Sequence, residues 1–193
     1  MAEPTRTSPL AGAATVAVSG PAPVAITALP FRGKLVLRGG PAIGEAAAEM
    51  LGVGLPRLMR SARGDRAEIL GLGPDEWLLL TEPGAEDALA GELRAALADR
   101  HYAVVVVSDR MTGIGVRGAR AVDVLATGCP LDLHPKVFRP GAVTRTLLGK
   151  AAVVLSHPDE AAAYELWVNG SFAPYLWLFL RNAALEFGVT SAA

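Results

Sequence analysis

The sequence predicts an α+β fold made of two degenerate ferredoxin-like halves, in which helices pack on antiparallel sheet. Segments typical of strands alternate with segments typical of helices along the chain. Each half has the same order of features: a strand ending in Arg-Gly, a helix, a connector with Leu-Pro or Cys-Pro, a strand pair with Glu and Trp, and a last helix. Glu76-Trp77 in the first half corresponds to Glu165 and Trp167 in the second, which is typical of an internal duplication.

The first half begins with an extended stretch and a helix. Residues 25–40 are rich in β-forming side chains and stop at Gly-Gly. In residues 41–53, Pro41 suits a first helical turn and apolar side chains recur near the helical period. Residues 54–66 are a basic loop, and residues 67–80 predict two short strands around a Gly-Pro-Asp turn.

The first half ends in the clearest helix of the chain, followed by a strand. Residues 81–100 place three leucines on one stripe, and Thr81 is the predicted N-cap. The unbroken valines of residues 102–109 predict a strand that is buried on both faces.

The second half repeats this order. Residues 111–118 are the predicted first strand, and residues 119–128 are a short helix that ends at Gly128. Residues 129–141 are a Pro-rich connector, and residues 143–168 predict a hairpin. The expected inward side chains of the short helix are Val122, Leu125 and Ala126, and the expected hairpin turn is His157-Pro158-Asp159.

The last predicted helix, residues 172–188, is apolar on more than one side. Ser171 can cap it, and its first turn tolerates Pro174. Two interpretations stay open: a core helix of this chain, or a helix with one face against a partner, since aromatic side chains are enriched at interfaces. On one face lie Phe172, Tyr175 and Phe179, whereas Trp177 points elsewhere.

Composition excludes several classes of partner. The chain has 193 residues with 18 basic and 19 acidic side chains, so it lacks the basic excess of a nucleic-acid-binding surface. It has no polybasic run for a membrane surface and no apolar run of about 20 residues. One cysteine permits no internal disulfide, which fits a reducing compartment. We therefore expect a cytoplasmic protein with neither a nucleic-acid nor a membrane partner.

The N-terminal stretch is rich in Ala, Pro, Ser and Thr and lacks the pattern of a secretory signal. This composition predicts an arm that is either disordered or lies on a partner. The predicted organisation is a flexible arm at 1–23, a domain at 24–188 with halves at 24–108 and 109–188, and a tail at 189–193.

The stretch "TGCPLDLHP" holds the only cysteine, Cys129, followed by Asp132 and His134. A catalytic cysteine needs a base and an electropositive setting, and zinc usually takes four ligands. Prolines on both sides of the stretch favour a turn, and the other two histidines are distant in sequence. The pattern favours Cys129 as a small buried hydrophobe and the other two as turn or interface side chains. A cysteine or metal enzyme at Cys129 is the alternative.

Other motifs carry little chemistry. The pieces "RGGPAIGEA" and "GIGVRGARA" lack the G-x-G-x-x-G spacing between a strand and a helix, and there is no Walker A, H-E-x-x-H or G-x-S-x-G motif. Asp109, Arg110 and Thr112 stand at the start of a predicted strand. Arg110 could bind an anion, although a surface ion pair, for example with Asp109, is favoured. We expect no catalytic, cofactor-binding or metal-binding residue in this chain.

Several segments together resemble a known family. These are "GPDEWLLL", "RGARAVDVLATGCPLDL", "RTLLGKA" and "YELWVNGSFAPYLWLFL". From about Val24 to Phe187 the chain resembles the gamma subunit of heterotetrameric sarcosine oxidase. More distantly, it is similar to the amino-terminal part of the folate-binding aminomethyltransferase fold of the glycine cleavage system.

The resemblance implies a complex of alpha, beta, gamma and delta subunits that oxidatively demethylates sarcosine to glycine. It implies FAD and FMN, NAD and tetrahydrofolate, and zinc in the other subunits. The gamma subunit of that family contacts alpha and is not known to carry catalytic residues. We therefore expect a non-catalytic gamma subunit that supports alpha and its folate-handling region. The alternative is a free-standing folate- or anion-binding module that uses Arg110, Arg117 or Arg145.

Overall fold

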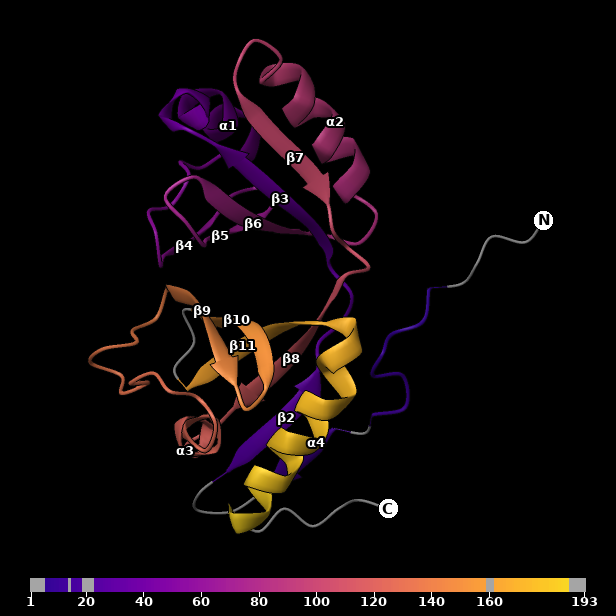
Figure 1. Ribbon diagram of the computed structural model, residues 1–193, viewed down its shortest axis with the longest axis vertical. Helices are drawn as coiled ribbons and strands as arrows, with labels where there is room; N and C mark the ends of the chain where they lie inside the picture. Colours follow the sequence, from indigo (N-terminus) through magenta and orange to yellow (C-terminus); the bar gives the residue numbers. More distant parts are fainter. Residues whose placement is uncertain (1–5, 14, 19–22, 159–161, 188–193) are drawn as a thin grey trace, which may run out of the picture.

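The computed structural model describes residues 6–13, 15–18, 23–158 and 162–187. Two antiparallel sheets face each other, and the helices cover their outer faces (Figure 1). The expected α+β fold with two ferredoxin-like halves is confirmed. No helix in these ranges is both long and apolar enough to cross a membrane.

The first half forms a five-stranded sheet in the order β4-β5-β6-β3-β7. Its helices α1 and α2 lie on one face of this sheet, at the top of Figure 1. The elements are β3 (Gly33–Gly39), η1 (Pro41–Ile43), α1 (Gly44–Leu51), β4 (Ser61–Arg63), β5 (Glu68–Gly71), β6 (Glu76–Thr81), α2 (Glu86–Ala96) and β7 (Tyr102–Val106).

The second half forms a six-stranded sheet in the order β1-β2-β8-β11-β10-β9. Its helices α3 and α4 cover the outer face, at the bottom of Figure 1. The elements are β1 (Val16–Val18), β2 (Val24–Ala28), β8 (Met111–Arg117), α3 (Ala121–Ala126), β9 (Ala142–Leu148), β10 (Ala151–His157), β11 (Ala163–Asn169), η2 (Gly170–Phe172), α4 (Ala173–Ala184) and η3 (Leu185–Phe187).

The second sheet takes strands from the N-terminal part of the chain. β2 pairs antiparallel with β8. In the first sheet, β7 pairs antiparallel with β3 in the same way, so β2 takes the position in the second sheet that β7 takes in the first. Val24 and Ile26 of β2 are buried because they face α4 and its core. The structure therefore differs from the predicted halves at 24–108 and 109–188, since β2 belongs to the second. Sequence order alone could not reveal this, because β2 and β3 appeared as one extended stretch.

The described part of the predicted arm also packs on its own chain. β1 pairs with β2, and its Val-Ala-Val alternation suits an edge strand. Leu10 is buried in the core of the second half. Residues 1–5, 14 and 19–22 of that arm, and the tail at 189–193, lie outside the described residues.

Alternate side chains of the central strands face different cores. In β6, Trp77 and Leu79 face α1 and α2, whereas Leu78 and Leu80 face the other sheet. In β11, Leu166 and Val168 face α3 and α4, whereas Trp167 lies between the sheets. β6 and β11 are thus equivalent strands, as the duplication predicted, but their tryptophans lie on opposite faces and are not equivalent.

The two sheets are also joined along their edge strands β4 and β9. The backbone amide of Ser61 donates to the carbonyl of Gly141 at 2.9 Å, and that of Val143 donates to Met59 at 3.1 Å. Two linkers, residues 29–32 and 107–110, connect the sheets. These backbone contacts and linkers fix the distance between the inner faces of the two sheets, and cavities remain between them.

β7 corrects the prediction of a strand buried on both faces. It pairs only with β3, and Val105 is 51% exposed. Val104 alone among its valines is buried, on the side of α2. The run of valines was misleading because β-branched side chains suit edge strands as well as central ones.

Both predicted helix caps are wrong. Thr81 ends β6 and donates its hydroxyl to the Glu82 carbonyl, whereas α2 begins only at Glu86. Ser171 lies in η2, and α4 follows Phe172 without a side-chain cap. Pro174 does occupy the first turn of α4, as expected.

The expected hairpin at 143–168 is a three-stranded meander. It has an additional turn at Gly149, where φ is +58°. His157 ends β10, and Asp159 lies outside the described residues. In α3 the buried side chains are Ala121, Val124 and Leu125, so of the three expected inward residues Leu125 is buried, Val122 half-buried and Ala126 exposed.

Candidate functional site

One cavity lies where the two linkers meet. It has a volume of about 360 Å³, and we call it the Lys34 cavity. Its walls are Lys34, parts of both linkers, Trp167 of β11 and the N-terminal segment 6–9. Thr112, noted in the sequence beside Arg110, also lines it.

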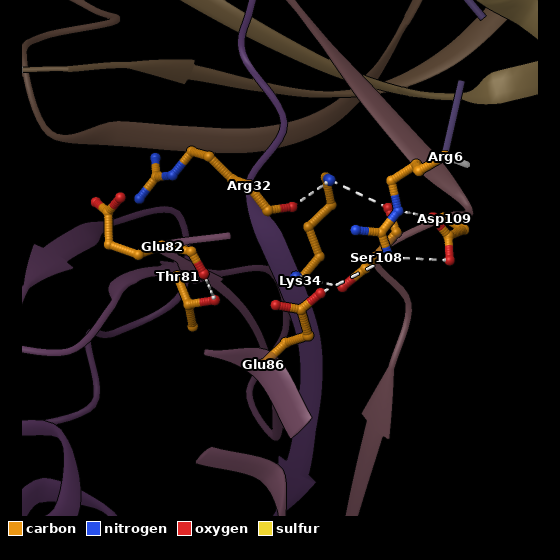
Figure 2. A network of polar contacts seen from close by, with 8 residues as sticks. All are labelled: Arg6, Arg32, Lys34, Thr81, Glu82, Glu86, Ser108 and Asp109. Carbon is orange, nitrogen blue, oxygen red and sulfur yellow. Dashed lines mark hydrogen bonds and ion pairs between the residues drawn. The ribbon is translucent and has the colours of Figure 1, made fainter. Parts of the chain in front are cut away.

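Lys34 is buried, with 1% of its surface exposed, and it holds both linkers. Its Nζ donates to the carbonyl of Arg32 at 2.7 Å and to that of Ser108 at 3.1 Å (Figure 2). The same Nζ lies 4.5 Å from the ring centre of Phe31 and 5.4 Å from that of Trp167. Removal from water lowers the pKa of Lys34 to about 8. The charge is thus stabilised by carbonyls and aromatic rings, which is typical of a lysine with a structural role.

Arg6 brings the N-terminal segment over this cavity. Its Nε lies 2.6 Å from Oδ1 of Asp109, and its guanidinium stacks 3.9 Å from the ring centre of Phe31. Figure 2 shows Arg6 next to Asp109 and Ser108 of the second linker. Asp109 therefore pairs with Arg6, and the predicted ion pair with Arg110 is not formed.

The pKa of Lys34 predicts a pH-dependent stability. Between pH 8 and about 10.5 the unfolded state binds more protons at this group than the folded state, so the free energy of unfolding rises with pH there. Below pH 8 the cost of the buried charge is fully present. Urea titrations at about pH 7 and about pH 9.5 should show this gain in the wild type and not in Lys34→Met. Equal pH dependence of both proteins would contradict it.

A second cavity, of about 370 Å³, lies between the inner faces of the two sheets. Arg38 of β3, Arg110 of the second linker and Arg145 of β9 line it, and we call it the arginine cavity. Apolar side chains from both sheets also line it: Val36, Leu72, Leu78, Val107, Met111 and Val154. It brings together two of the arginines that the sequence indicated, whereas Arg117, at the end of β8, does not line it.

The arginines of this cavity differ in their partners. Arg145 forms a bidentate ion pair with Glu76, whose pKa it lowers through these hydrogen bonds. Nη2 of Arg38 lies 3.2 Å from Oδ2 of Asp75. Nε of Arg110 donates to Oδ1 of Asn169 at 3.3 Å.

Cys129, Asp132 and His134 do not form a catalytic arrangement. Cys129 is buried, and its Sγ lies 4.0 Å from the Thr146 hydroxyl. Oδ1 of Asp132 accepts from the backbone amide of His134, and Nδ1 of His134 accepts from that of Lys136. Both side chains thus stabilise the turn, as the sequence favoured. Within the described ranges, no group of three or more His, Cys, Asp or Glu side chains could hold a metal ion.

The last helix packs mainly on its own chain. Leu176, Trp177 and Leu180 are buried in the core of the second half. Tyr175 and Phe179 pack on Gly128 and Gly149: an added Cβ would clash with the Phe179 ring at Gly128 and with the Tyr175 hydroxyl at Gly149. The large apolar side chains that remain exposed on the helix and at its ends are Phe172, Tyr175, Leu178 and Leu185. The core interpretation is therefore correct for most of the helix, and an exposed apolar strip remains.

Lys34 and Arg38 were not selected from the sequence. Both lie on β3, where Lys34, Val36 and Arg38 alternate with buried leucines. The alternation of Lys34, Val36 and Arg38 with leucines, which places two cations on one face of the strand, was the available signal. Nothing in the sequence indicated that a second sheet would cover this face.

Comparisons with known proteins agree with this architecture. The sequence model of the family described as "Sarcosine oxidase, gamma subunit family" matches residues 38–186. The sarcosine oxidase subunit gamma of Corynebacterium sp. (strain P-1) is 36% identical over 144 residues, which are 74% of this chain and 70% of that protein.

Solved structures show the same relation. A chain of the heterotetrameric sarcosine oxidase from Corynebacterium sp. U-96, in complex with pyrrole 2-carboxylate, superposes with a TM-score of 0.86 and 31% identity, covering 97% of this chain and 99% of that one. The glycine cleavage system aminomethyltransferase T from Bartonella henselae superposes with a TM-score of 0.60 and 14% identity, covering 80% of this chain and 44% of that one. The second likeness shows a shared fold alone.

Proposed function

The chain belongs to the sarcosine oxidase gamma subunit family, and from this we propose that it is the non-catalytic gamma subunit of a sarcosine oxidase-like flavoenzyme. That enzyme oxidatively demethylates sarcosine to glycine. The observation that carries the proposal is the superposition on a chain of a heterotetrameric sarcosine oxidase over almost the whole length of both chains.

The local chemistry supports a non-catalytic role. Asp132 and His134 are used in a turn, and Cys129 is buried beside a threonine. Lys34 is held by two carbonyls. A nucleophile or base must be able to reach a substrate, and each of these groups is engaged by its own chain.

The proposed partners are the alpha subunit, in direct contact, and the beta and delta subunits of the same complex. FAD, FMN, NAD, tetrahydrofolate and zinc are proposed for the other subunits, and the complex is proposed to be cytoplasmic. The gamma subunit would support the folate-handling region of alpha, and its distant fold relation to an aminomethyltransferase is consistent with that.

We propose that the exposed strip of α4 contacts the alpha subunit. Phe172, Tyr175 and Leu178 lie on it at helical spacing, and half of the Leu178 surface is exposed. An aromatic and aliphatic strip of this kind is typical of an interface core.

Assembly of the complex tests this proposal. The tagged full chain is co-expressed with the alpha, beta and delta subunits of the same organism and purified through its tag. We expect all three to co-purify with the wild type, and Leu178→Asp to recover roughly tenfold less, since it buries a charge in an apolar contact. Leu58→Asp is the matched control, because the two leucines are 53% and 52% exposed. If no other subunit co-purifies with the wild type, the gamma role is refuted. If Leu178→Asp and Leu58→Asp recover equal amounts, only the proposed contact through the α4 strip is refuted.

A further inference from the structure

The arginine cavity has the size and lining of a ligand site. Its volume of about 370 Å³ lies within the usual range for small-molecule sites. Its floor is formed by Val36 and Leu78 of one sheet and Val154 of the other, which belong to or pack against the core between the sheets. An apolar floor with a few charged groups around it is the usual construction of such a site.

The charges around this floor are not balanced. Arg145 and Arg38 each have a carboxylate partner, Glu76 and Asp75. Arg110 forms no ion pair with a carboxylate within the described ranges; its partner is the neutral amide of Asn169. Three guanidinium groups that line one cavity repel each other, and two carboxylates leave one positive charge uncompensated.

The geometry of Arg110 suits an incoming carboxylate. Its Nε is fixed by Oδ1 of Asn169 at 3.3 Å, which orients the guanidinium and leaves the two terminal nitrogens for another acceptor. A guanidinium presents its donors in a planar fork that matches the two oxygens of a carboxylate. Met111, the next residue, lines the apolar part of the same cavity, so one molecule can contact both.

We propose that the arginine cavity binds a small organic monocarboxylate with an apolar body. The carboxylate lies against Arg110, near Arg145, and the apolar body enters between the two sheets over Val36, Leu78 and Val154. The site belongs to this chain alone, so it does not depend on the proposed assembly with other subunits.

Benzoate, a planar apolar carboxylate, is a suitable probe for the purified full chain. A titration followed by two-dimensional NMR should show saturable shifts of residues that line the cavity. Benzyl alcohol, which has the same ring without the charge, should bind at least about tenfold more weakly, because it cannot form the charged hydrogen bonds.

Substitutions assign the binding to Arg110. We expect Arg110→Gln to weaken benzoate binding about tenfold or more, and Arg110→Lys to weaken it less, since it keeps the charge but not the fork. Arg120→Gln is the matched control: it removes the same charge from an exposed arginine that pairs with Asp123. Arg110→Lys serves as the test if Arg110→Gln does not fold.

A third variant should act in the opposite direction. Glu76→Gln removes the carboxylate that competes for Arg145, so benzoate should bind severalfold more tightly than to the wild type. The proposal is overturned if benzoate does not bind, if benzyl alcohol binds equally well, or if the Arg110 variants and Arg120→Gln bind alike.

Discussion

A Trp167→Ala variant is expected to lose about 3–5 kcal/mol of unfolding free energy, the usual loss when a buried tryptophan is truncated. Trp167 is fully buried and lies at the centre of the core between the two sheets. Gly113 of β8 lies directly beneath its ring: a Cβ there would come within 2.9 Å of the indole. The neighbouring strands are fixed by their ladders and cannot collapse into the space, so a cavity remains.

Chemical denaturation of the purified chain measures this loss. Val105→Ala is the control, because Val105 also lies on an inner strand face but is half exposed; we expect a change below about 1 kcal/mol there. Since Trp167 also faces the Nζ of Lys34, Trp167→Ala should also change how the free energy of unfolding varies with pH. A loss in Trp167→Ala no larger than that in Val105→Ala would show that the sheets do not pack as described.

The second large effect is expected at Gly118, where β8 meets the start of β2. The φ angle there is +112°, which L side chains rarely adopt. A Cβ would clash with the carbonyl of Pro23, coming within 2.9 Å of its carbon and 3.2 Å of the Val24 Cα. Gly118→Ala should therefore cost more than the roughly 1–3 kcal/mol of a strained backbone alone, because β2 must also move away.

Gly84→Ala separates the two contributions. Gly84 has a φ of +83° and no atom within 4 Å of an added Cβ, so its substitution adds strain without a clash. Hydrogen exchange adds a local readout: the amides of β2 should lose protection in Gly118→Ala and keep it in Gly84→Ala. If both variants lose the same stability and β2 stays protected, the close approach of Gly118 to Pro23 contributes nothing.

The elements that the sequence predicted well are those whose signal is local. α2 has a leucine stripe, and the pair β5 and β6 has a Gly-Pro-Asp turn, so both were found. The position of β2 is not a local property. β2 joins the sheet whose edge strand is left unpaired by the rest of the fold. That strand is β8, which lies far from β2 in the sequence.

The candidate site was only partly predictable for the same reason. Arg110 and Arg145 could be selected as cations, but their meeting in one cavity depends on how the two sheets face each other. The ion pair expected between Asp109 and Arg110 is not formed because residues 107–110 make a turn, in which the Arg110 amide donates to the Val107 carbonyl at 3.1 Å, and the two side chains find other partners. Asp109 contacts Arg6 on one side, and Arg110 contacts Asn169 on the other.

The origin of β2 has a consequence for modularity. The first half, from β3 to β7, is a contiguous insertion between β2 and β8 of the second half. A fragment that starts at residue 109 would expose the edge of β8 to other chains, and unpaired edges of this kind promote aggregation. The two halves resemble each other as duplicates, yet only the first could be cut out as a separate piece. For recombination or fragment expression, the smallest unit that keeps both sheets complete extends from β1 to α4.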